Sequence, residues 1–500
     1  MSTIPRRPNV LVVMSDEQSW NTLGANGNAA AHTPHLDALA AEATSFDRCY
    51  TPFPLCCPSR ASLWTGRMPR HHGVLGNWRP IVPDLRDTGV AQAFRKDGYH
   101  TIYSGKWHVP GTTPERMGWV DRSAIPAVLG GQDRGRYIPD YRDYAAARGY
   151  RLDPRHIENL TAEDIAHTTG PGAVPYATAS ISDDDFLETW QTGEFLRALD
   201  RRPGDSPWLA ACSFNAPHFP MVVPAPYDRI IDRSRVRLPD SLAAGAGTRP
   251  REVRESHYAT DFVHLTTEQW TEVTAHYLGL CALVDTQFGR IVEYLRAAGE
   301  WDNTIVVFTT DHGDMMGAHG LMEKGHLLHY EEALRVPLLI RHPGRPAARN
   351  TNLTSVCDIA RTLATLAGVP WDEPDDGRCF AHAVGATGAA PTREYVSAET
   401  TLADGQAGGH GDPFYAEHWS YPRDSLNASI RTARARYVFR SHDEDELFDL
   451  TTDPSEVTNL ADRPDRQAER QLLRDLLAGE LADAFPSMAE RLRHPAGHAG

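Results

Sequence analysis

The chain has 500 residues, of which 41% are hydrophobic and 23% are charged, and its formal net charge at pH 7 is −16. This length can bury the core of one large domain and of a smaller second domain. The negative charge argues against nucleic-acid binding, so an anionic substrate would have to be attracted by a local group of basic side chains.

The cysteines and the N-terminal residues bear on the cellular compartment. Seven cysteines are scattered without a Cys-x-x-Cys pair, which argues against a disulfide framework and against a cysteine zinc site. The hydrophobic run from Val10 to Met14 is too short for the core of a signal peptide, and no run is long enough to span a membrane. We therefore predict a cytoplasmic protein.

Four hydrophobic segments predict buried strands, and polar residues follow each of them directly. The segments are 9–14, 99–103, 208–214 and 304–310. Because ligands collect outside the carboxyl ends of parallel strands, we expect the polar residues to face one crevice. They are Asp16 and Glu17, Lys106 and His108, Asn215 and His218, and Asp311 and His312.

Segments with helical spacing alternate with these strands. Helices are predicted at 35–44, 90–96, 184–198, 267–298 and 358–366, and a fifth strand at 336–340. The alternation predicts an α/β fold with a mainly parallel central sheet flanked by helices. Within a catalytic domain of residues 1–384, we interpret residues 110–180, which are rich in glycine, proline and tyrosine, as an insertion that shapes the pocket.

The pattern of predicted secondary structure changes near residue 385. Short strands are predicted between residues 430 and 450, and a helix between 465 and 485. We therefore assign residues 385–490 to a smaller C-terminal α+β subdomain. Residues 491–500 form a tail, which we expect to be disordered from residue 495.

Residues 55–67 combine a turn, a helix start and reactive side chains. Pro58 suits the first turn of a helix that continues to Trp64. Cys56 then lies at the helix N-terminus, where free N–H groups and the helix dipole favour a thiolate or a bound anion, and Arg60 lies one turn further on. The pattern predicts a reactive cysteine beside an anion site. The alternative is that Cys56 and Cys57 are small buried hydrophobic residues.

The candidate residues divide into three chemical groups. Carboxylates and one imidazole suit a hard divalent cation, and they are Asp16, Glu17, Asp311 and His312. Basic side chains suit the oxygens of a tetrahedral anion, and they are Arg60, Lys106 and Lys324. Two histidines, His108 and His218, remain for proton transfer.

The segment 56–60, Cys-Cys-Pro-Ser-Arg, followed by Thr-Gly-Arg at 65–67, resembles the signature of the type I sulfatases of the alkaline phosphatase superfamily. In that family the first cysteine of the element is converted to formylglycine, and the matching residue is Cys56. The formylglycine-generating enzyme would be its partner in maturation. Other motifs of the family resemble further segments, so that the resemblance covers nearly the whole chain. These segments are 105–108, 217–220, 310–324 and 446–460.

The resemblance implies an alkaline-phosphatase-like fold, one calcium ion and hydrolysis of a small-molecule sulfate monoester through a formylglycine sulfo-enzyme intermediate. The implied metal ligands are Asp16, Glu17, Cys56, Asp311 and His312. The family commonly has Asp-Asp and Asp-Asn pairs at the carboxylate positions, so Glu17 departs from the first pair and His312 from the second. The nitrogen ligand leaves room for manganese or zinc.

The resemblance also assigns roles to the basic residues. Arg60 and Lys106 would stabilise the formylglycine hydrate, and Lys324 would bind the sulfate oxygens. His218 would assist the departing alcohol, and His108 would remove a proton so that sulfate leaves.

Two other functions compete with this one. A phosphonate monoester hydrolase or phosphodiesterase of the same superfamily can share the formylglycine, but Lys106 and His108 favour a sulfatase, because the phosphonate enzymes carry neutral hydroxyl residues there. A catalytically silent binding protein is disfavoured by the intact motifs. The sequence does not identify the alcohol, since its aromatic residues could line a pocket or belong to the core. These aromatic residues are Trp78, Trp107, Tyr137, Tyr141, Tyr144 and Tyr150.

Overall fold

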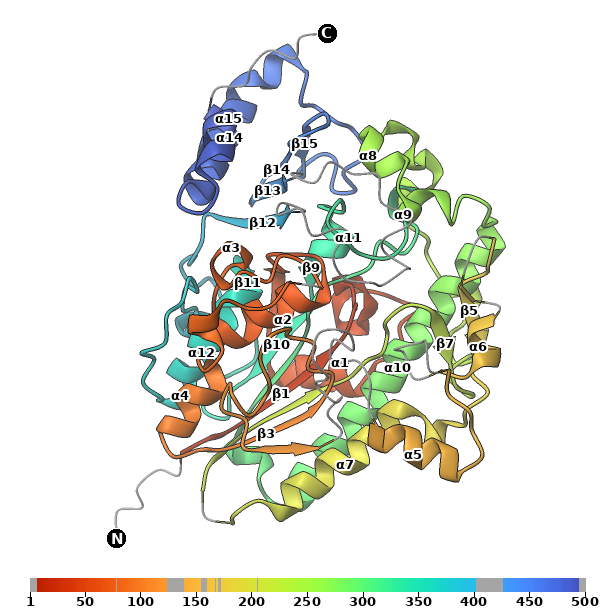
Figure 1. Cartoon of the computed structure of the whole chain (residues 1–500), viewed down its shortest axis with the longest axis vertical. Helices are drawn as coiled ribbons and strands as arrows, with labels where there is room; N and C mark the ends of the chain where they lie inside the picture. Colours follow the sequence, from red (N-terminus) through yellow and green to blue (C-terminus); the bar gives the residue numbers. More distant parts are fainter. Residues whose placement is uncertain are drawn as a thin grey trace.

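The computed structural model describes residues 7–493, apart from residues 78, 124–138, 154–159, 167, 170, 171, 205 and 402–425. Figure 1 shows a large layered part built around one sheet and a smaller part that carries the last two helices. The α/β fold with a smaller C-terminal α+β part, expected from the sequence, is confirmed.

A nine-stranded sheet forms the centre of the large part. Its four middle strands are parallel and neighbour one another in the order β8 (Thr304–Thr310), β1 (Asn9–Ser15), β6 (Trp208–Ser213) and β3 (His100–Gly105). Val10 of β1 pairs with Ile305 on one side and with Leu209 on the other. Every residue of β1 and β8 is buried, which explains why these strands read as continuous hydrophobic runs.

Further strands extend the sheet beyond β8 and β3. They are β2 (Thr44–Tyr50), β10 (Leu338–Arg341), β11 (Ala348–Ser355), β4 (Asp121–Ser123) and β9 (Arg335–Val336). β10 is antiparallel to both β8 and β2, so the sheet is mixed around a parallel centre. The helix predicted at 35–44 is wrong at its end, because α1 (Pro34–Glu42) stops before β2 begins.

Helices cover both faces of the sheet (Figure 1). On the face that presents Leu11 and Val13 lie α1, α7 (Leu187–Arg201) and α10 (Thr267–Ala297). On the face that presents Val10 and Val12 lie α2 (Cys56–Thr65), α4 (Val90–Lys96) and α12 (Ile359–Ala367). Alternate residues of one strand therefore enter two separate hydrophobic cores.

The smaller part is a four-stranded antiparallel sheet with two helices. Its elements are β12 (Tyr395–Thr401), β13 (Leu426–Thr432), β14 (Ala435–Arg440), β15 (Glu446–Asp449), α14 (Gln467–Leu481) and α15 (Pro486–Arg493). α15 continues past the predicted boundary at 490. The residues expected to be disordered, 495–500, lie outside the described part.

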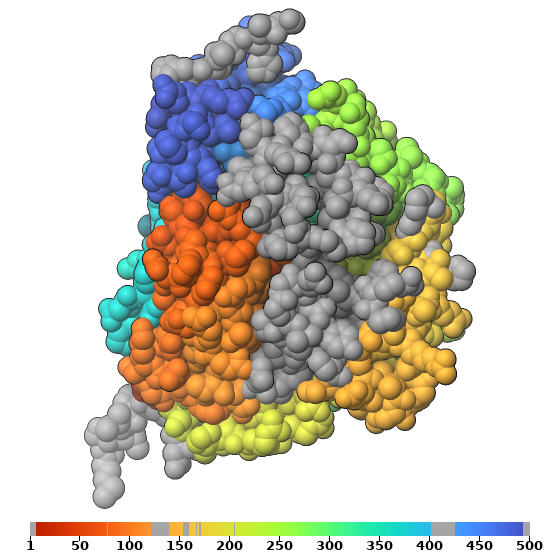
Figure 2. All heavy atoms as spheres, in the orientation of Figure 1, coloured from red at the N-terminus to blue at the C-terminus, as the bar shows by residue number. Residues whose placement is uncertain are grey.

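The smaller part contacts the large part next to α2. Figure 2 shows the C-terminal helices against the residues that follow α2. Arg70 of α3 (Pro69–His72) forms ion pairs with Glu399 of β12 at 2.7 Å and with Glu480 of α14 at 3.0 Å. The remaining elements are short: α5 (Pro139–Ala147), α6 (Ala162–Ala166), α8 (Arg251–Arg254), α9 (His257–Thr260), α11 (Glu331–Leu334), β5 (Tyr176–Thr178) and β7 (Met221–Val223). Among the described helices, none has the length and apolar character needed to cross a membrane.

Of the aromatic residues that could have lined a pocket, Tyr141 and Trp107 belong to the core, whereas Tyr144 and Tyr150 are only partly buried beside it. Tyr141 is fully buried and packs against Trp190, with ring centroids 5.4 Å apart. Trp107 is buried against Tyr103 at 5.1 Å. Trp78 and Tyr137 lie outside the described residues.

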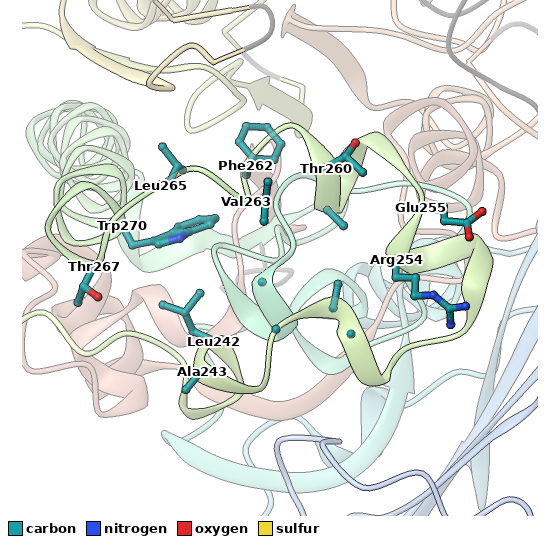
Figure 3. Close-up of a pocket in the computed structure, with 15 residues that line it drawn as sticks. Leu242, Ala243, Arg254, Glu255, Thr260, Phe262, Val263, Leu265, Thr267 and Trp270 are labelled. Carbon is teal, nitrogen blue, oxygen red and sulfur yellow. The ribbon is translucent and has the colours of Figure 1, made fainter.

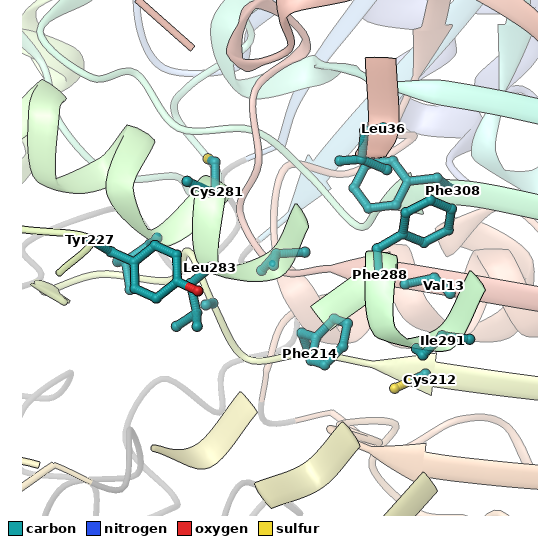
Figure 4. Close-up of a cluster of buried hydrophobic side chains, with 14 of the residues drawn as sticks. Val13, Leu36, Cys212, Phe214, Tyr227, Cys281, Leu283, Phe288, Ile291 and Phe308 are labelled. Atoms are coloured by element: carbon teal, nitrogen blue, oxygen red, sulfur yellow. The ribbon is translucent and has the colours of Figure 1, made fainter. Parts of the chain in front are cut away.

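Packing between α10 and the sheet should dominate the stability of the large part. Phe288 of α10 is fully buried and meets Phe308 of β8 edge to face, with ring centroids 6.2 Å apart (Figure 4). Phe288→Ala should lower the free energy of unfolding by about 3–5 kcal/mol, because it leaves a cavity in a close-packed core. Leu472→Ala is the control, since Leu472 is 60% exposed. Equal shifts of the two variants in denaturant unfolding would contradict this prediction.

Candidate active site

Cys56 is the first residue of α2, as the proline pattern predicts. Leu55 precedes it in extended conformation, and all ten residues of the helix are buried. Cys57 packs into the hydrophobic core, and its backbone N–H donates to Asn77 Oδ1 at 3.1 Å, so the hydrophobic alternative holds for this second cysteine. Burial, and next the charge of Asp16, raise the pKa of the Cys56 thiol to about 11. In the unmodified chain this favours the neutral thiol over the thiolate, one of the two anions considered for this position.

Arg60 joins the two carboxylates that follow β1 and β8. Its Nη2 donates to Asp16 Oδ2 at 2.7 Å and its Nε donates to Asp311 Oδ2 at 2.8 Å. Its Nη1 donates to the carbonyl of Lys106 at 2.7 Å and to Ser213 Oγ at 2.8 Å. Burial opposes the charge of Arg60, but Asp311 and Asp16 raise its pKa above the ordinary value. One guanidinium thus holds the carboxyl ends of four strands together.

Four predicted ligands form one buried group: Asp16, Cys56, Asp311 and His312. Their potential ligand atoms all lie within 4.8 Å of one another. His312 Nε2 lies 3.2 Å from Cys56 Sγ, and burial lowers the pKa of His312, which favours the neutral imidazole that metals bind. Carboxylates with one imidazole form a donor set suited to a divalent cation.

The fifth predicted ligand, Glu17, falls in a second group with Asp16 and His218. Its Oε2 lies 2.6 Å from Lys324 Nζ and 3.4 Å from His218 Nε2. Its φ of 66° is left-handed, and the hydroxyl of Tyr277 donates to its carbonyl at 2.7 Å. The carboxylate of Glu17 is therefore directed towards the basic residues.

Two lysines and a histidine complete the arrangement. Lys106 Nζ lies 2.7 Å from Asp16 Oδ2 and 4.0 Å from Cys56 Sγ. Lys324 Nζ lies 3.1 Å from His218 Nε2. Burial opposes the charge of Lys324, but Glu17 raises its pKa well above the ordinary value. The local group of basic side chains expected from the sequence is present in spite of the negative charge of the chain.

His108 lies in the loop after β3, two residues beyond Lys106. It is fully buried, and its φ of 53° is left-handed. A non-glycine residue keeps this conformation only when its surroundings hold it there, and such residues cluster at functional sites. Asn215 contributes a turn in which its carbonyl accepts from the backbone N–H of His218 at 3.1 Å.

Sequence reasoning missed three residues that support this site. Ser213, the last residue of β6, accepts from Arg60, and its position at a strand end was the available signal. Asp314 raises the pKa of Glu17, after burial as the larger cause, and it lies within the 310–324 segment. Tyr277 lies in the middle of α10, where its spacing marks only a core residue.

A cavity of about 670 Å³ lies in another region and is lined largely by residues 242–270 (Figure 3). Leu242, Phe262, Leu265 and Trp270 are the larger apolar side chains of this lining, which also includes Val263 and several alanines. The cavity contains none of the candidate catalytic residues, so it is not the centre of the chemistry.

The fold and this group of side chains define an enzyme of the alkaline phosphatase superfamily. A family model described as sulfatase matches residues 8–369, and a model described as N-sulphoglucosamine sulphohydrolase, C-terminal, matches residues 317–482. The chain belongs to the sulfatase family, and it is a sulfatase enzyme. Both the family and the fold expected from the sequence are confirmed.

Individual proteins similar to this chain include two sulfatases and a phosphonate monoester hydrolase. The chain is 28% identical to a choline-sulfatase of Rhizobium meliloti, over 92% of this chain and 83% of that protein. It is 29% identical to an arylsulfatase of Clostridium perfringens, over 95% of this chain and 94% of that protein. Among solved structures, the phosphonate monoester hydrolase of Agrobacterium radiobacter is similar at a TM-score of 0.77 and 28% identity, with 96% of each chain covered.

Removal of one carboxylate should test the buried group of candidate metal ligands directly. Asp311→Asn should weaken binding of a divalent cation by more than about tenfold, because an amide replaces a charged candidate ligand of similar shape. Asp376→Asn is the control, since it alters a part-buried carboxylate that contacts His71 outside the group. Equilibrium dialysis with metal analysis measures the affinity. Unchanged cation binding by Asp311→Asn would contradict the assignment of this residue.

Proposed function

We propose that this sulfatase hydrolyses a small-molecule sulfate monoester to an alcohol and sulfate, using a formylglycine made from Cys56 and one calcium ion. The observation that carries the proposal is the position of Cys56 Sγ, 3.2 Å from His312 Nε2 and 3.8 Å from Asp16 Oδ1 at a buried helix N-terminus. A group at this position meets the cation ligands and the lysines together. The formylglycine-generating enzyme is the maturation partner that this chemistry requires.

The side chains around position 56 fit both groups. Asp16, Asp311 and His312 offer two carboxylates and one imidazole, and an oxygen at position 56 would replace the thiol sulfur in the set. The cation and the formylglycine together supply an activated hydroxyl for attack on sulfur. The imidazole also accepts manganese or zinc, which are the alternatives to calcium.

The three basic side chains take different roles in this proposal. Lys106 Nζ, 4.0 Å from Cys56 Sγ, places a positive charge beside the attacking group. Lys324 binds sulfate oxygens and stabilises the charge that develops on them. Arg60 uses its donors on Asp16, Asp311 and backbone or hydroxyl oxygens, so it acts by holding the ligands in position.

His218 is the proposed proton donor to the departing alcohol. Its Nδ1 lies 2.7 Å from the carbonyl oxygen of Phe219, which can only accept, so Nδ1 carries a proton in that hydrogen bond. Nε2 is then the atom that gains and releases the catalytic proton. His108 is the proposed base in the step that releases sulfate.

The second candidate function is hydrolysis of phosphonate monoesters. The observation that favours it is the similarity to the Agrobacterium radiobacter enzyme over 96% of each chain. Lys106 and His108 favour the sulfatase, because the family resemblance implies that the phosphonate enzymes carry neutral hydroxyl residues at these positions.

One substrate panel tests the function. Protein produced with the formylglycine-generating enzyme and loaded with calcium should hydrolyse aryl, sugar or alkyl sulfates faster than phosphonate monoesters and phosphate diesters. Cys56→Ala should abolish turnover, whereas Cys57→Ala is the matched control that should retain it. Peptide mass spectrometry should find the aldehyde at position 56. Faster turnover of phosphonate monoesters would favour the second candidate.

The roles of the two histidines can be separated by the leaving group. His218→Ala should slow alkyl and sugar sulfates by about a hundredfold or more, but nitrophenyl sulfate much less, because nitrophenolate departs without protonation. His108→Ala should instead release about one equivalent of alcohol per enzyme and then turn over slowly. Rapid-quench measurement of alcohol release distinguishes the two. A burst from His218→Ala and none from His108→Ala would reverse the assignment.

A further inference from the structure

Lys324 projects from a backbone turn that needs external support. Glu323, which precedes it, has a left-handed φ of 68°, and Gly325, which follows it, has a φ of 155°. A side chain at Gly325 would collide with the hydroxyl of Tyr258, so glycine is required there. Backbone in these regions persists only where the surrounding contacts hold it.

The residues before Lys324 are held by the loop itself. The backbone N–H of Glu323 donates to Asp314 Oδ1 at 3.2 Å, and the backbone N–H of Met315 donates to the carbonyl of Glu323 at 3.0 Å. These bonds fix the turn at one end only. The other end must be fixed by the residues that follow Lys324.

The residues after Lys324 are held by the C-terminal sheet. The hydroxyl of Thr400, in β12, donates to the carbonyl of His326 at 2.5 Å, and Asn427 Nδ2, in β13, donates to the same carbonyl at 3.3 Å. Arg440 Nη2, in β14, donates to the carbonyl of Leu327 at 3.1 Å. Side chains of three neighbouring strands thus donate to two consecutive backbone carbonyls, and all three hydrogen bonds are buried.

A histidine of the same loop connects these strands further. His329 Nε2 lies 2.9 Å from Thr400 Oγ1, and its Nδ1 lies 3.0 Å from Ser429 Oγ. Because the hydroxyl hydrogen of Thr400 goes to His326, its oxygen accepts from His329 Nε2. Thr400 therefore links two points of the loop, and a side chain without a hydroxyl would lose both hydrogen bonds.

We propose that the C-terminal sheet positions Lys324 for its contact with substrate, and that Thr400 is the positioning residue. Lys324 Nζ lies within 3.1 Å of both Glu17 Oε2 and His218 Nε2, so a small movement of its backbone would change its distance from the reacting group. The inference rests on the proposed function in one respect, namely that Lys324 binds oxygens of the substrate. The inference adds that residues of the C-terminal sheet control the contact between Lys324 and the substrate.

Thr400→Val tests the proposal, because valine has the same shape and lacks the hydroxyl. The kcat/KM should fall about tenfold, since a displaced binding group loses transition-state stabilisation. Thr400→Ser, which restores the hydroxyl, should recover most of the loss. Thr432→Val is the matched control, because the hydrogen bonds that described residues form with the Thr432 hydroxyl, in β13, lie in the turn at residues 434 and 435. Asn427→Ala removes the second donor to the His326 carbonyl and provides an independent variant.

A double-mutant cycle separates positioning from general destabilisation. If Thr400 acts through Lys324, Thr400→Val should lower kcat/KM much less in a Lys324→Ala background than in the parent. Equal losses in the two backgrounds would overturn the proposal. Hydrogen exchange provides a measurement without substrate: amides of residues 323–330 should exchange faster in Thr400→Val, but not in Thr432→Val. Unchanged exchange in Thr400→Val and Asn427→Ala would also overturn it.

Failure of the proposed function has a different signature. If the parent enzyme hydrolyses phosphonate monoesters and no sulfate ester, the proposed function is wrong, and the cycle is run with the phosphonate. The exchange measurement does not depend on the reaction at all. The positioning role of Thr400 is therefore tested in either case.

Discussion

The structure depends on the burial of one guanidinium, that of Arg60, between two carboxylates. A fully desolvated charge is very costly unless it is paired and its donors are satisfied. Arg60 meets this requirement with Asp16, Asp311, the carbonyl of Lys106 and the hydroxyl of Ser213. The planar fork of arginine can serve several acceptors at fixed angles, which the single ammonium of lysine cannot do. The two carboxylates of the candidate cation site are held in place by this one side chain.

A second set of charges continues from the first. Glu17 brings together Lys324 and His218, and Lys106 contacts Asp16, so that each cation of the site has a carboxylate partner. Each of the three carboxylates Asp16, Glu17 and Asp311 pairs with at least one of the basic groups Arg60, Lys106 and Lys324. This balance allows six ionisable side chains to lie together at the sheet edge in a protein whose net charge is −16.

The sequence predicts the parallel centre of the sheet because β1, β6 and β8 are buried on both faces and read as hydrophobic runs. It does not predict β2 and β11, since β2 contains Asp47 and Arg48 and β11 is polar and partly exposed at the edge of the sheet. The antiparallel direction of β10 depends on its long-range partners. The site could be anticipated because its residues follow strand ends. The partners of Arg60 could not, because Asp311 lies 251 positions away.

The boundary between the two parts also depends on long-range contacts. The change in the pattern of predicted elements places it near residue 385. Hydrogen bonds cross this boundary: side chains of β12, β13 and β14 donate to backbone carbonyls of the loop after Lys324. Tyr330 donates to Glu446 of β15 at 2.9 Å, and Glu446 also pairs with Arg440. The second family model begins at residue 317 and therefore includes this loop with the C-terminal sheet. The loop that carries Lys324 precedes residue 384 in the chain, and buried polar contacts join it to the C-terminal sheet.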